Sequence, residues 1–283
     1  MLMRMLAGIR QPSYTRDLHG KRILVTGASG GIGKATCEEL RRSGARVVGI
    51  DRKADTGVLE ADITEREAVQ RAVQRAIEEL GGLDILLNVA GIGLPQDAGA
   101  IPGDEVTLTL EVNLLGPWLV TACALPALVA SRGRVITVAS GLAFANVPFA
   151  SAYAASKRAV AAWSDALRLE YGSHIDVTTI YPGYIKTPIH TASLAAGVSL
   201  EGLVREEPLS AAVQTLVRAC QGRPKRDMAT TRLGSIEIGL ARHFPSLIDL
   251  VIMGRLSRLG RTRRYKGSKL AKGMFERWKV ERS

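Results

Sequence analysis

The stretch Thr26 to Gly33, which reads TGASGGIG, constrains the fold more than any other part of the chain. It follows a short apolar run at 22–25 that predicts a strand, and it leads into a helix-forming segment at 34–42. Gly27, Gly31 and Gly33 permit a tight turn and a close approach of the backbone to a ligand. The free N–H groups and the positive end of the helix dipole favour a pyrophosphate there. The spacing differs from the common G-x-G-x-x-G fingerprint, so the loop needs support from further motifs.

Apolar runs and helical segments alternate along the rest of the chain. Further strands are predicted at 46–50, 57–61, 83–87, 133–139, 175–181 and 226–231, with helices at 65–80, 105–129, 153–171 and 209–220. We expect Thr64 to cap the helix at 65–80, and Gly116-Pro117 and Pro126 to interrupt the one at 105–129. This alternation predicts an α/β fold, a Rossmann-type doubly wound parallel sheet with three α/β/α layers in a single domain.

The chain of 283 residues is long enough to bury one large core, and its composition shows no break in the middle. We expect an N-terminal leader at 1–19 and a dinucleotide-binding catalytic domain at 20–232, followed by an apolar helix and a basic tail at 233–283. Residues 188–208 have no strong core pattern and predict a mobile cover over the strand ends. The apolar patch at 5–9 in the leader is too short for a signal peptide or a membrane span.

Asp51 ends the second predicted strand, 18 residues beyond Gly33. An acidic residue near that distance binds the adenosine ribose hydroxyls in dinucleotide sites. Its carboxylate would also repel a 2′-phosphate, which favours NAD over NADP as the cofactor. Arg52 and Lys53 follow directly and weaken that preference, and the alternative is that Asp51 only forms a turn.

A second group of polar residues is spaced for chemistry. Tyr153 and Lys157 lie four residues apart on a predicted helix and therefore share one face of it. Ser140 ends the strand before that helix, at the edge of the sheet where ligands bind in open α/β folds. Such a Tyr–Lys pair is usually solvated surface when it stands alone. Together with Ser140, and with Asn113 before it, the pair predicts an active site.

These motifs together resemble the short-chain dehydrogenase/reductase family, from Gly20 to Thr231. The elements that carry the resemblance are T-G-x-x-x-G-x-G at 26–33, Asp62, N-x-A-G at 88–91, the set Ser140, Tyr153 and Lys157, and Pro182-Gly183 leading to Thr187. Val89 departs from the family pattern, which usually has a second Asn there.

The resemblance implies a dehydrogenase or reductase that uses NAD, with NADP the less expected cofactor. Tyr153 would be the acid/base, and Lys157 would lower its pKa and hold the nicotinamide ribose. Ser140 would position the substrate oxygen, and Asn113 would fix a water that relays protons to Lys157. We expect the cofactor to contact Gly27, Ser29, Gly31, Ile32, Gly33, Asp51, Arg52, Asp62, Ile63, Asn88, Ala90, Gly91, Tyr153, Lys157, Pro182, Gly183, Ile185 and Thr187.

The expected walls of the substrate site are apolar. They are Ile92, Leu94, Leu142, Phe144, Val147 and Phe149, with Tyr184, Ile189, Leu194 and Leu203 from the cover. No Lys or Arg stands among them, although Lys186 and Arg205 are near in sequence. This pattern predicts a small lipophilic substrate, a secondary alcohol or ketone of the steroid, retinoid or long-chain lipid type. The alternative is that these side chains belong to the core.

Cysteine and histidine spacing gives no sign of a metal site. The residues concerned are Cys37, Cys123 and Cys220, and His19, His174, His190 and His243. They form no C-x-x-C and no ligand spacing, so we expect no metal and no disulfide framework. Free thiols indicate a reducing, cytoplasmic location.

The net charge of +11 is concentrated at the C-terminal end. Residues 254–283 hold eleven Lys or Arg against two Glu, a net +9, which leaves +2 for the other 253 residues. The apolar run at 244–253 is too short to span a bilayer, but beside so many cations it suits an anionic membrane surface. A helix packed over the substrate mouth and a solvated tail are the alternatives. We expect no nucleic-acid partner, because few aromatic residues are interleaved with the cations.

Other functions remain open at this point. One is a sugar-nucleotide epimerase or dehydratase, and another is a non-catalytic scaffold that senses the cofactor at a membrane. Trp118 and Trp163 are expected to pack or to form subunit contacts. Since the helices that carry them pair across a dimer interface in related proteins, the resemblance implies a homo-oligomer.

Overall fold

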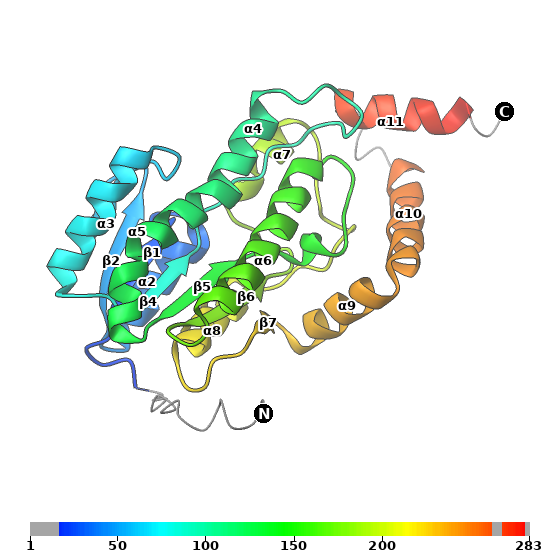
Figure 1. Cartoon of the computed structure of the whole chain (residues 1–283). Coiled ribbons are helices and arrows are strands. Elements are labelled where there is room, and N and C mark those ends of the chain that lie inside the picture. The colour runs from blue at the N-terminus through cyan, green and yellow to red at the C-terminus, as the bar shows by residue number, and fades with distance from the viewer. Residues whose placement is uncertain (1–16, 262–267, 281–283) are drawn as a thin grey trace.

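The computed structural model describes residues 17–261 and 268–280. One parallel sheet of seven strands runs through the middle of the molecule, with helices on both faces (Figure 1). The strands are β1 (Arg22–Thr26), β2 (Arg46–Asp51), β3 (Val58–Glu60), β4 (Ile85–Asn88), β5 (Arg134–Val138), β6 (Asp176–Tyr181) and β7 (Asp227–Ala229). Their order is β3-β2-β1-β4-β5-β6-β7, with parallel pairing throughout. The predicted doubly wound parallel sheet is confirmed.

The two faces of the sheet are covered by different helices. Helices α3 (Arg66–Leu80), α5 (Gly116–Ser131) and α6 (Ser151–Tyr171) lie on one face, and α2 (Gly31–Arg42) and α8 (Leu209–Cys220) lie on the other. Successive residues of β1 alternate between them, since Leu24 packs with the first group and Ile23 and Val25 with the second. Because helices cover both faces, β1, β4 and β5 are buried along nearly their whole length.

The long helical region before β5 differs from the prediction, because it is not interrupted at Gly116-Pro117 or at Pro126. Helix α4 (Asp104–Leu110) continues through a π-helical turn, η1 (Glu111–Leu115), directly into α5. Pro117 follows the π turn directly, and α5 runs on through Pro126. The wider π turn absorbs the irregularity, and it contains Asn113.

The stretch Asp104–Ser131 is long and apolar enough to cross a membrane by length and composition alone. In the structure it lies against the sheet, beside α3 and α6, and buries Val120, Ala124 and Leu128 completely. A core helix of an α/β fold passes the same test, so this stretch is a packing helix of the domain.

A smaller correction concerns the start of α3. Thr64 does not cap this helix, because the N-cap residue is Glu65 and has no side-chain capping bond. The Thr64 hydroxyl instead donates to Asp62 Oδ1 at 2.8 Å, since a carboxylate two residues back is the nearer partner. The predicted end of α3 is confirmed, because Gly81 adopts the left-handed conformation at φ 72°.

The chain after β7 forms three helices in its described part. They are α9 (Arg232–His243), α10 (Pro245–Arg261) and α11 (Lys269–Val280). Ile252 and Leu256 of α10 are buried with Val147 and Leu203, and Ala271 and Met274 of α11 are buried with Phe149 and Val198. The basic segment is thus largely helical where it is described, and it packs over the cover segment (residues 188–208) that holds η3 (Pro188–His190) and α7 (Thr191–Ala195).

Candidate active site

The glycine turn after β1 forms as the sequence predicts. Gly27 has φ +70°, and a Cβ on Gly33 would lie 2.0 Å from the Gly27 carbonyl oxygen, so both positions require glycine. A Cβ on Gly31 would lie 3.1 Å from Thr187 Cγ2 and would fill the space between the turn and Thr187. Helix α2 starts at Gly31 with no side-chain cap at Gly30, which leaves first-turn N–H groups for an anion. These residues fit the phosphates of a dinucleotide.

Asp51 stands at the end of β2, next to the glycine turn. Its Oδ2 accepts a hydrogen bond from Ser29 N at 2.9 Å, and its Oδ1 accepts one from Arg52 N at 2.7 Å. The Ser29 hydroxyl in turn donates to the Lys53 carbonyl at 3.2 Å. Asp51 therefore does more than form a local turn, because it fixes the loop of β1 against the end of β2.

The remaining residues of the predicted adenine half lie along the same edge of the sheet. Asp62 follows β3, and its Oδ1 also accepts from Thr64 N at 2.9 Å. Ile63 is buried against Gly116, so only its main chain can reach a ligand. Asn88 Nδ2 donates to Thr121 Oγ1 at 3.0 Å, and Ala90 N donates to Thr26 Oγ1 at 3.3 Å, which ties the N-x-A-G turn to β1.

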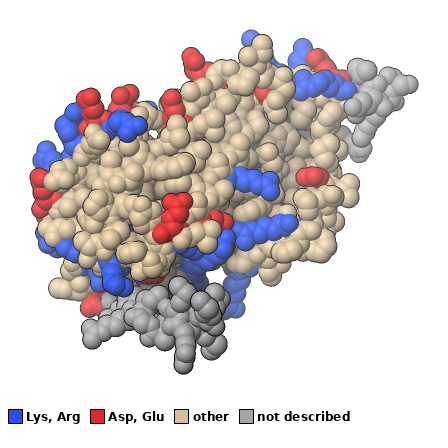
Figure 2. Space-filling model, in the orientation of Figure 1, with Lys and Arg blue, Asp and Glu red and all other residues tan. Residues whose placement is uncertain are grey.

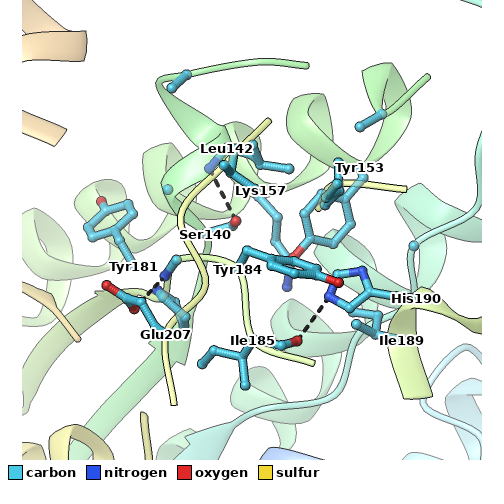
Figure 3. Close-up of a pocket in the computed structure, with 18 of the residues that line it drawn as sticks. Ser140, Leu142, Tyr153, Lys157, Tyr181, Tyr184, Ile185, Ile189, His190 and Glu207 are labelled. Carbon is cyan, nitrogen blue, oxygen red and sulfur yellow. Dashed lines mark hydrogen bonds between the residues drawn. The ribbon is translucent and has the colours of Figure 1, made fainter. Parts of the chain in front are cut away.

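Ser140, Tyr153 and Lys157 meet in one pocket (Figure 3). Ser140 follows β5, and its Oγ accepts from Leu142 N at 3.1 Å. Tyr153 and Lys157 both come from the first turns of α6, and Lys157 Nζ lies 5.8 Å from the centre of the Tyr153 ring. The Ser140 side chain also acts on the Tyr153 hydroxyl, because it lowers the pKa of that group. The three side chains that the sequence placed on separate elements are therefore brought together.

Burial perturbs both titrating groups of this trio. Desolvation raises the pKa of Tyr153, and the Ser140 side chain partly opposes that rise. Desolvation lowers the pKa of Lys157 to about 8, and its Nζ donates to the Val138 carbonyl at 3.0 Å. At neutral pH Tyr153 is therefore protonated and Lys157 is mostly cationic, so the pocket pairs a phenol with a nearby ammonium.

Asn113 lies beside this trio without lining the pocket. Its Oδ1 accepts from Ile92 N at 2.8 Å, and its Nδ2 donates to the Ile92 carbonyl at 2.9 Å and to Ser156 Oγ at 3.0 Å. A Cβ on Gly91 would lie 3.1 Å from Asn113 Oδ1 and 3.2 Å from Lys157 Nζ. The side chain thus fixes the segment that follows Gly91 next to Lys157, while its predicted role in a proton relay stays a prediction.

The turn after β6 faces the trio from the other side of the pocket. Pro182, Gly183, Ile185 and Thr187 all line it, together with Ile32 and Gly91. The pocket therefore gathers the residues predicted for the nicotinamide half of a cofactor. Gly27, Ser29, Gly31, Gly33, Asp51, Arg52, Asp62, Ile63, Asn88 and Ala90 lie outside this pocket, at or after the ends of β1 to β4.

Glu207 is a residue of this site that the sequence did not reveal. It is 3% exposed, and its Oε2 accepts from Gly183 N at 3.0 Å while Thr231 Oγ1 donates to its Oε1 at 2.6 Å. The Thr230 hydroxyl and Arg205 also donate to this carboxylate. Glu207 therefore anchors the Pro182-Gly183 turn to the end of β7. No spacing pattern links an acid at 207 to residues at 183 and 230.

The pocket has a volume of about 350 Å³, and its walls differ from the prediction in two ways. Leu94, Leu142, Phe149, Tyr184 and Ile189 line it as expected. Ile92, Phe144, Val147, Leu194 and Leu203 do not, because Val147 and Leu203 pack under α10, Phe144 packs on Tyr181, and Leu194 is exposed.

The second difference is the presence of charge. Arg205, Glu207, Glu237 and Arg255 line the pocket, contrary to the expectation that no Lys or Arg would do so. Glu237 and Arg255 reach it because α9 and α10 form one wall, which also contributes Ile238, Ala241, Ile248 and Ile252. Arg205 and Glu207 come from the segment just before α8. The pocket is thus largely apolar, with charged residues among its walls. Helix α10 packs over the pocket, which was one of the alternatives for the apolar run, and the expected membrane contact of that run stays a prediction.

The cysteines are free thiols. Burial raises the pKa of Cys37 to about 11 and that of Cys220 to about 12, so both stay protonated at neutral pH. Neither thiol belongs to the pocket.

Comparison with known proteins agrees with this geometry. A family model described as short chain dehydrogenase matches residues 21–196. The chain is 31% identical to dehydrogenase/reductase SDR family member 7B of Rattus norvegicus over 81% of this chain and 78% of the relative. It is 35% identical to a 3-ketodihydrosphingosine reductase of Bacteroides thetaiotaomicron over 58% of this chain and 64% of the relative.

Solved structures share the fold. A short chain dehydrogenase from Burkholderia cenocepacia in complex with NADP superimposes with a TM-score of 0.72 at 26% identity, over 83% of this chain and 99% of that one. The matched part contains the glycine turn, Ser140, Tyr153 and Lys157 in the family model, while α9 to α11 lie beyond it.

Proposed function

Because the chain belongs to the short-chain dehydrogenase/reductase family, we propose that it transfers a hydride between NAD(H) and a lipophilic ketone or secondary alcohol. The observation that carries the proposal is the meeting of Ser140, Tyr153 and Lys157 in a pocket lined by the turn after β6. The bound nicotinamide supplies or accepts the hydride. Every other task falls to side chains of this chain.

Ser140 and Tyr153 hold the reacting oxygen of the substrate. Both side chains line the same pocket, so an oxygen that binds between them receives contacts from two positioned hydroxyls. In reduction, Tyr153 donates its proton to the oxygen as the carbon gains hydride. In oxidation, the phenolate removes the hydroxyl proton, and the ammonium of Lys157 stabilises that phenolate.

The substrate that suits this pocket is largely apolar. Leu94, Leu142, Ile248 and Ile252 supply apolar wall, and the Arg205 cation is paired with Glu207 and Glu237. A relative that is 35% identical bears the name 3-ketodihydrosphingosine reductase, which supports a lipophilic ketone as substrate. A panel of long-chain, steroid and retinoid ketones and alcohols, followed by NADH absorbance, tests the proposal. If only polar sugars or short alcohols turn over, the lipophilic assignment is wrong.

Asp51 supports NAD as the cofactor, although a structural neighbour holds NADP. Its carboxylate is fixed by Ser29 N beside the glycine turn, where a 2′-phosphate would meet a negative charge. We expect Asp51→Ala to shift the ratio of kcat/KM for NAD over NADP towards NADP by about tenfold, which is the effect of 1.4 kcal/mol.

Asp55→Ala is the matched control, since Asp55 is an acid four residues on that pairs with Lys34 at 3.8 Å. This control should leave the ratio unchanged. An unchanged ratio in Asp51→Ala itself would show that Asp51 only holds the loop. Wild-type preference for NADP that Arg52→Ala abolishes would reverse the assignment.

We also propose a homo-oligomer that forms through α4, η1 and α5. Leu108, Leu115 and Trp118 expose apolar surface there, and Trp118 stacks on Trp163 of α6 with ring centres 5.9 Å apart. An apolar face of this kind on a folded domain indicates a subunit contact. Leu115→Arg should therefore lower the mass measured by light scattering to that of one chain, while Ile101→Arg, at another exposed site, should not. A wild-type protein that is already monomeric would contradict the proposal.

A further inference from the structure

The two helices α9 and α10 have two different apolar faces. The inner face packs on the domain and lines the pocket through Gly234, Ile238, Ala241, Ile248 and Ile252. The outer face is formed by Leu233, Ile236, Leu240, Phe244, Leu247, Leu250, Val251 and Met253, whose exposed fractions run from 40% to 70%. We call these eight residues the outer apolar face.

The residues of the outer apolar face recur at helical spacing and are not scattered. Leu233, Ile236 and Leu240 are three and four residues apart on α9, and Leu247, Leu250 and Val251 are three and four residues from one another or adjacent on α10, so each helix carries an apolar stripe. Phe244 lies at the junction, where α9 ends and α10 begins. A group of large exposed apolar side chains on two successive helices marks an interaction surface.

The charge around this face favours one class of partner. Helices α9 and α10 carry five Arg against two acids, Glu237 and Asp249, which is 5 − 2 = +3. Two of these Arg face inward, because Arg242 packs on Phe144 and Arg255 lines the pocket. The sequence from 254 to 283 carries a net +9. In Figure 2 the part of the molecule formed by α9 and α10 is mostly tan, with blue patches beside it. Apolar side chains on a net-positive pair of helices complement the acyl chains and headgroups of an anionic bilayer.

A second copy of the chain is a poorer occupant. A two-fold contact through this face would bring together two helix pairs of net +3 each, and like charges across an interface oppose association. The uncharged exposed residues of α4 and α5 offer a contact between copies without that penalty. We therefore propose that the outer apolar face docks on the surface of an anionic phospholipid bilayer.

The outer apolar face lies next to the pocket, so docking would bring the pocket to the membrane surface. This part of the inference rests on the proposed function. Val251 belongs to the outer apolar face and also lines the pocket, and Arg255 lines the pocket one turn further along α10. The pocket thus reaches the surface that would lie on the membrane. A lipophilic substrate can then pass from the bilayer into the site without crossing water.

Vesicle flotation of the full chain tests the docking directly and needs no turnover. The probe is vesicles of phosphatidylcholine with or without phosphatidylserine. We expect the wild type to float with the anionic vesicles, more weakly with phosphatidylcholine alone, and less at high salt. Phe244→Ser/Leu250→Ser should reduce the bound fraction about tenfold, because two exposed apolar anchors are lost. Ile101→Ser/Leu169→Ser, which removes two apolar side chains exposed elsewhere, is the matched control and should bind like the wild type.

Neither Phe244 nor Leu250 lines the pocket, so turnover of a water-soluble substrate should be unchanged in the variant. Loss of vesicle binding with retained turnover supports the docking whatever the physiological substrate is. Equal vesicle binding by the variant and the wild type overturns it. A fall in the oligomer mass of the variant, with no flotation of the wild type, would show that the face binds another copy instead.

Discussion

Tyr153→Phe is expected to lower turnover about 10³-fold, which is within the range that a positioned general acid or base contributes. The substitution removes one hydroxyl from the ring that faces Lys157 and Ser140. Neither remaining group can replace it, because a serine hydroxyl is a far weaker acid and Lys157 Nζ is turned to the Val138 carbonyl. Single-turnover and steady-state rates with a substrate of the panel measure the loss.

The same variant should bind the cofactor nearly as well as the wild type. The phenyl ring of the variant still fills the space beside Gly93, since a Cβ built on Gly93 would lie 3.7 Å from Tyr153 Cδ2. The substitution does not change the glycine turn. Quenching of tryptophan fluorescence by NADH gives the Kd. Tyr171→Phe is a control, since that tyrosine lies at the other end of α6. Turnover of Tyr153→Phe within a few-fold of the wild type would refute the acid/base role.

The pKa directions add a pH dependence to this expectation. Burial raises the pKa of Tyr153, so the acid needed for reduction is present at neutral pH. Oxidation needs the phenolate and should therefore accelerate as pH rises. Lys157 opposes that trend above its pKa of about 8, because the cation that stabilises the phenolate is then lost. The oxidation rate should pass through a maximum above neutral pH, while reduction should be faster at pH 7 than at pH 9.

Local patterns predicted the parts of this structure that depend on short stretches of chain. The glycine turn, Asp51 and the end of α3 at Gly81 follow from residues that act through their own backbone conformation or the next few neighbours. The spacing of Tyr153 and Lys157 likewise fixes their relative placement, because one turn of helix lies between them. These features needed no knowledge of the tertiary fold.

Features that depend on distant partners could not be read from the sequence. Glu207 looks like one of several surface acids, and only the meeting of β6, β7 and the cover segment gives its carboxylate four donors. Pro117 resembles a helix breaker, but a π turn before it lets the helix continue. Glu237 and Arg255 enter the pocket because α9 and α10 fold back over it, a long-range contact that no local pattern encodes.

For the same reason, the sequence did not predict correctly which apolar residues line the pocket and which belong to the core. Val147 and Leu203 are apolar and near the site in sequence, yet α10 covers them with Ile252 and Leu256. The wall of an apolar pocket and a buried core contain the same types of residue, so composition does not distinguish them. Only the packing of the C-terminal helices separates the two.

Lys157→Met is expected to abolish turnover and at the same time to stabilise the cofactor-free protein at pH 7. The side chain is 3% exposed, and burial lowers its pKa from 10.5 to about 8. A lowered pKa means that the folded chain holds the proton less tightly than the unfolded chain, so the buried ammonium costs about 3 kcal/mol where both states are protonated. Methionine keeps most of the volume without the charge, and loss of the bond to the Val138 carbonyl costs about 1 kcal/mol in return.

The net gain should be about 2 kcal/mol, which corresponds to a rise in Tm of roughly 5 °C for a domain of this size. The difference between the two proteins should shrink as pH rises from 8 to 10.5, because the wild-type amine then loses its proton in both states. Thermal unfolding at pH 7 and pH 10 measures both effects. Lys34→Met, at an exposed lysine that pairs loosely with Asp55, should change Tm little at either pH.

If Lys157→Met instead lowers Tm at pH 7, the ammonium stabilises the fold, and the cost assigned to its burial is wrong. If the variant is stabilised as expected but turns over like the wild type, the cation has no part in catalysis. Stabilisation together with loss of turnover would show that the buried ammonium destabilises the fold and is needed for catalysis by the neighbouring phenol of Tyr153.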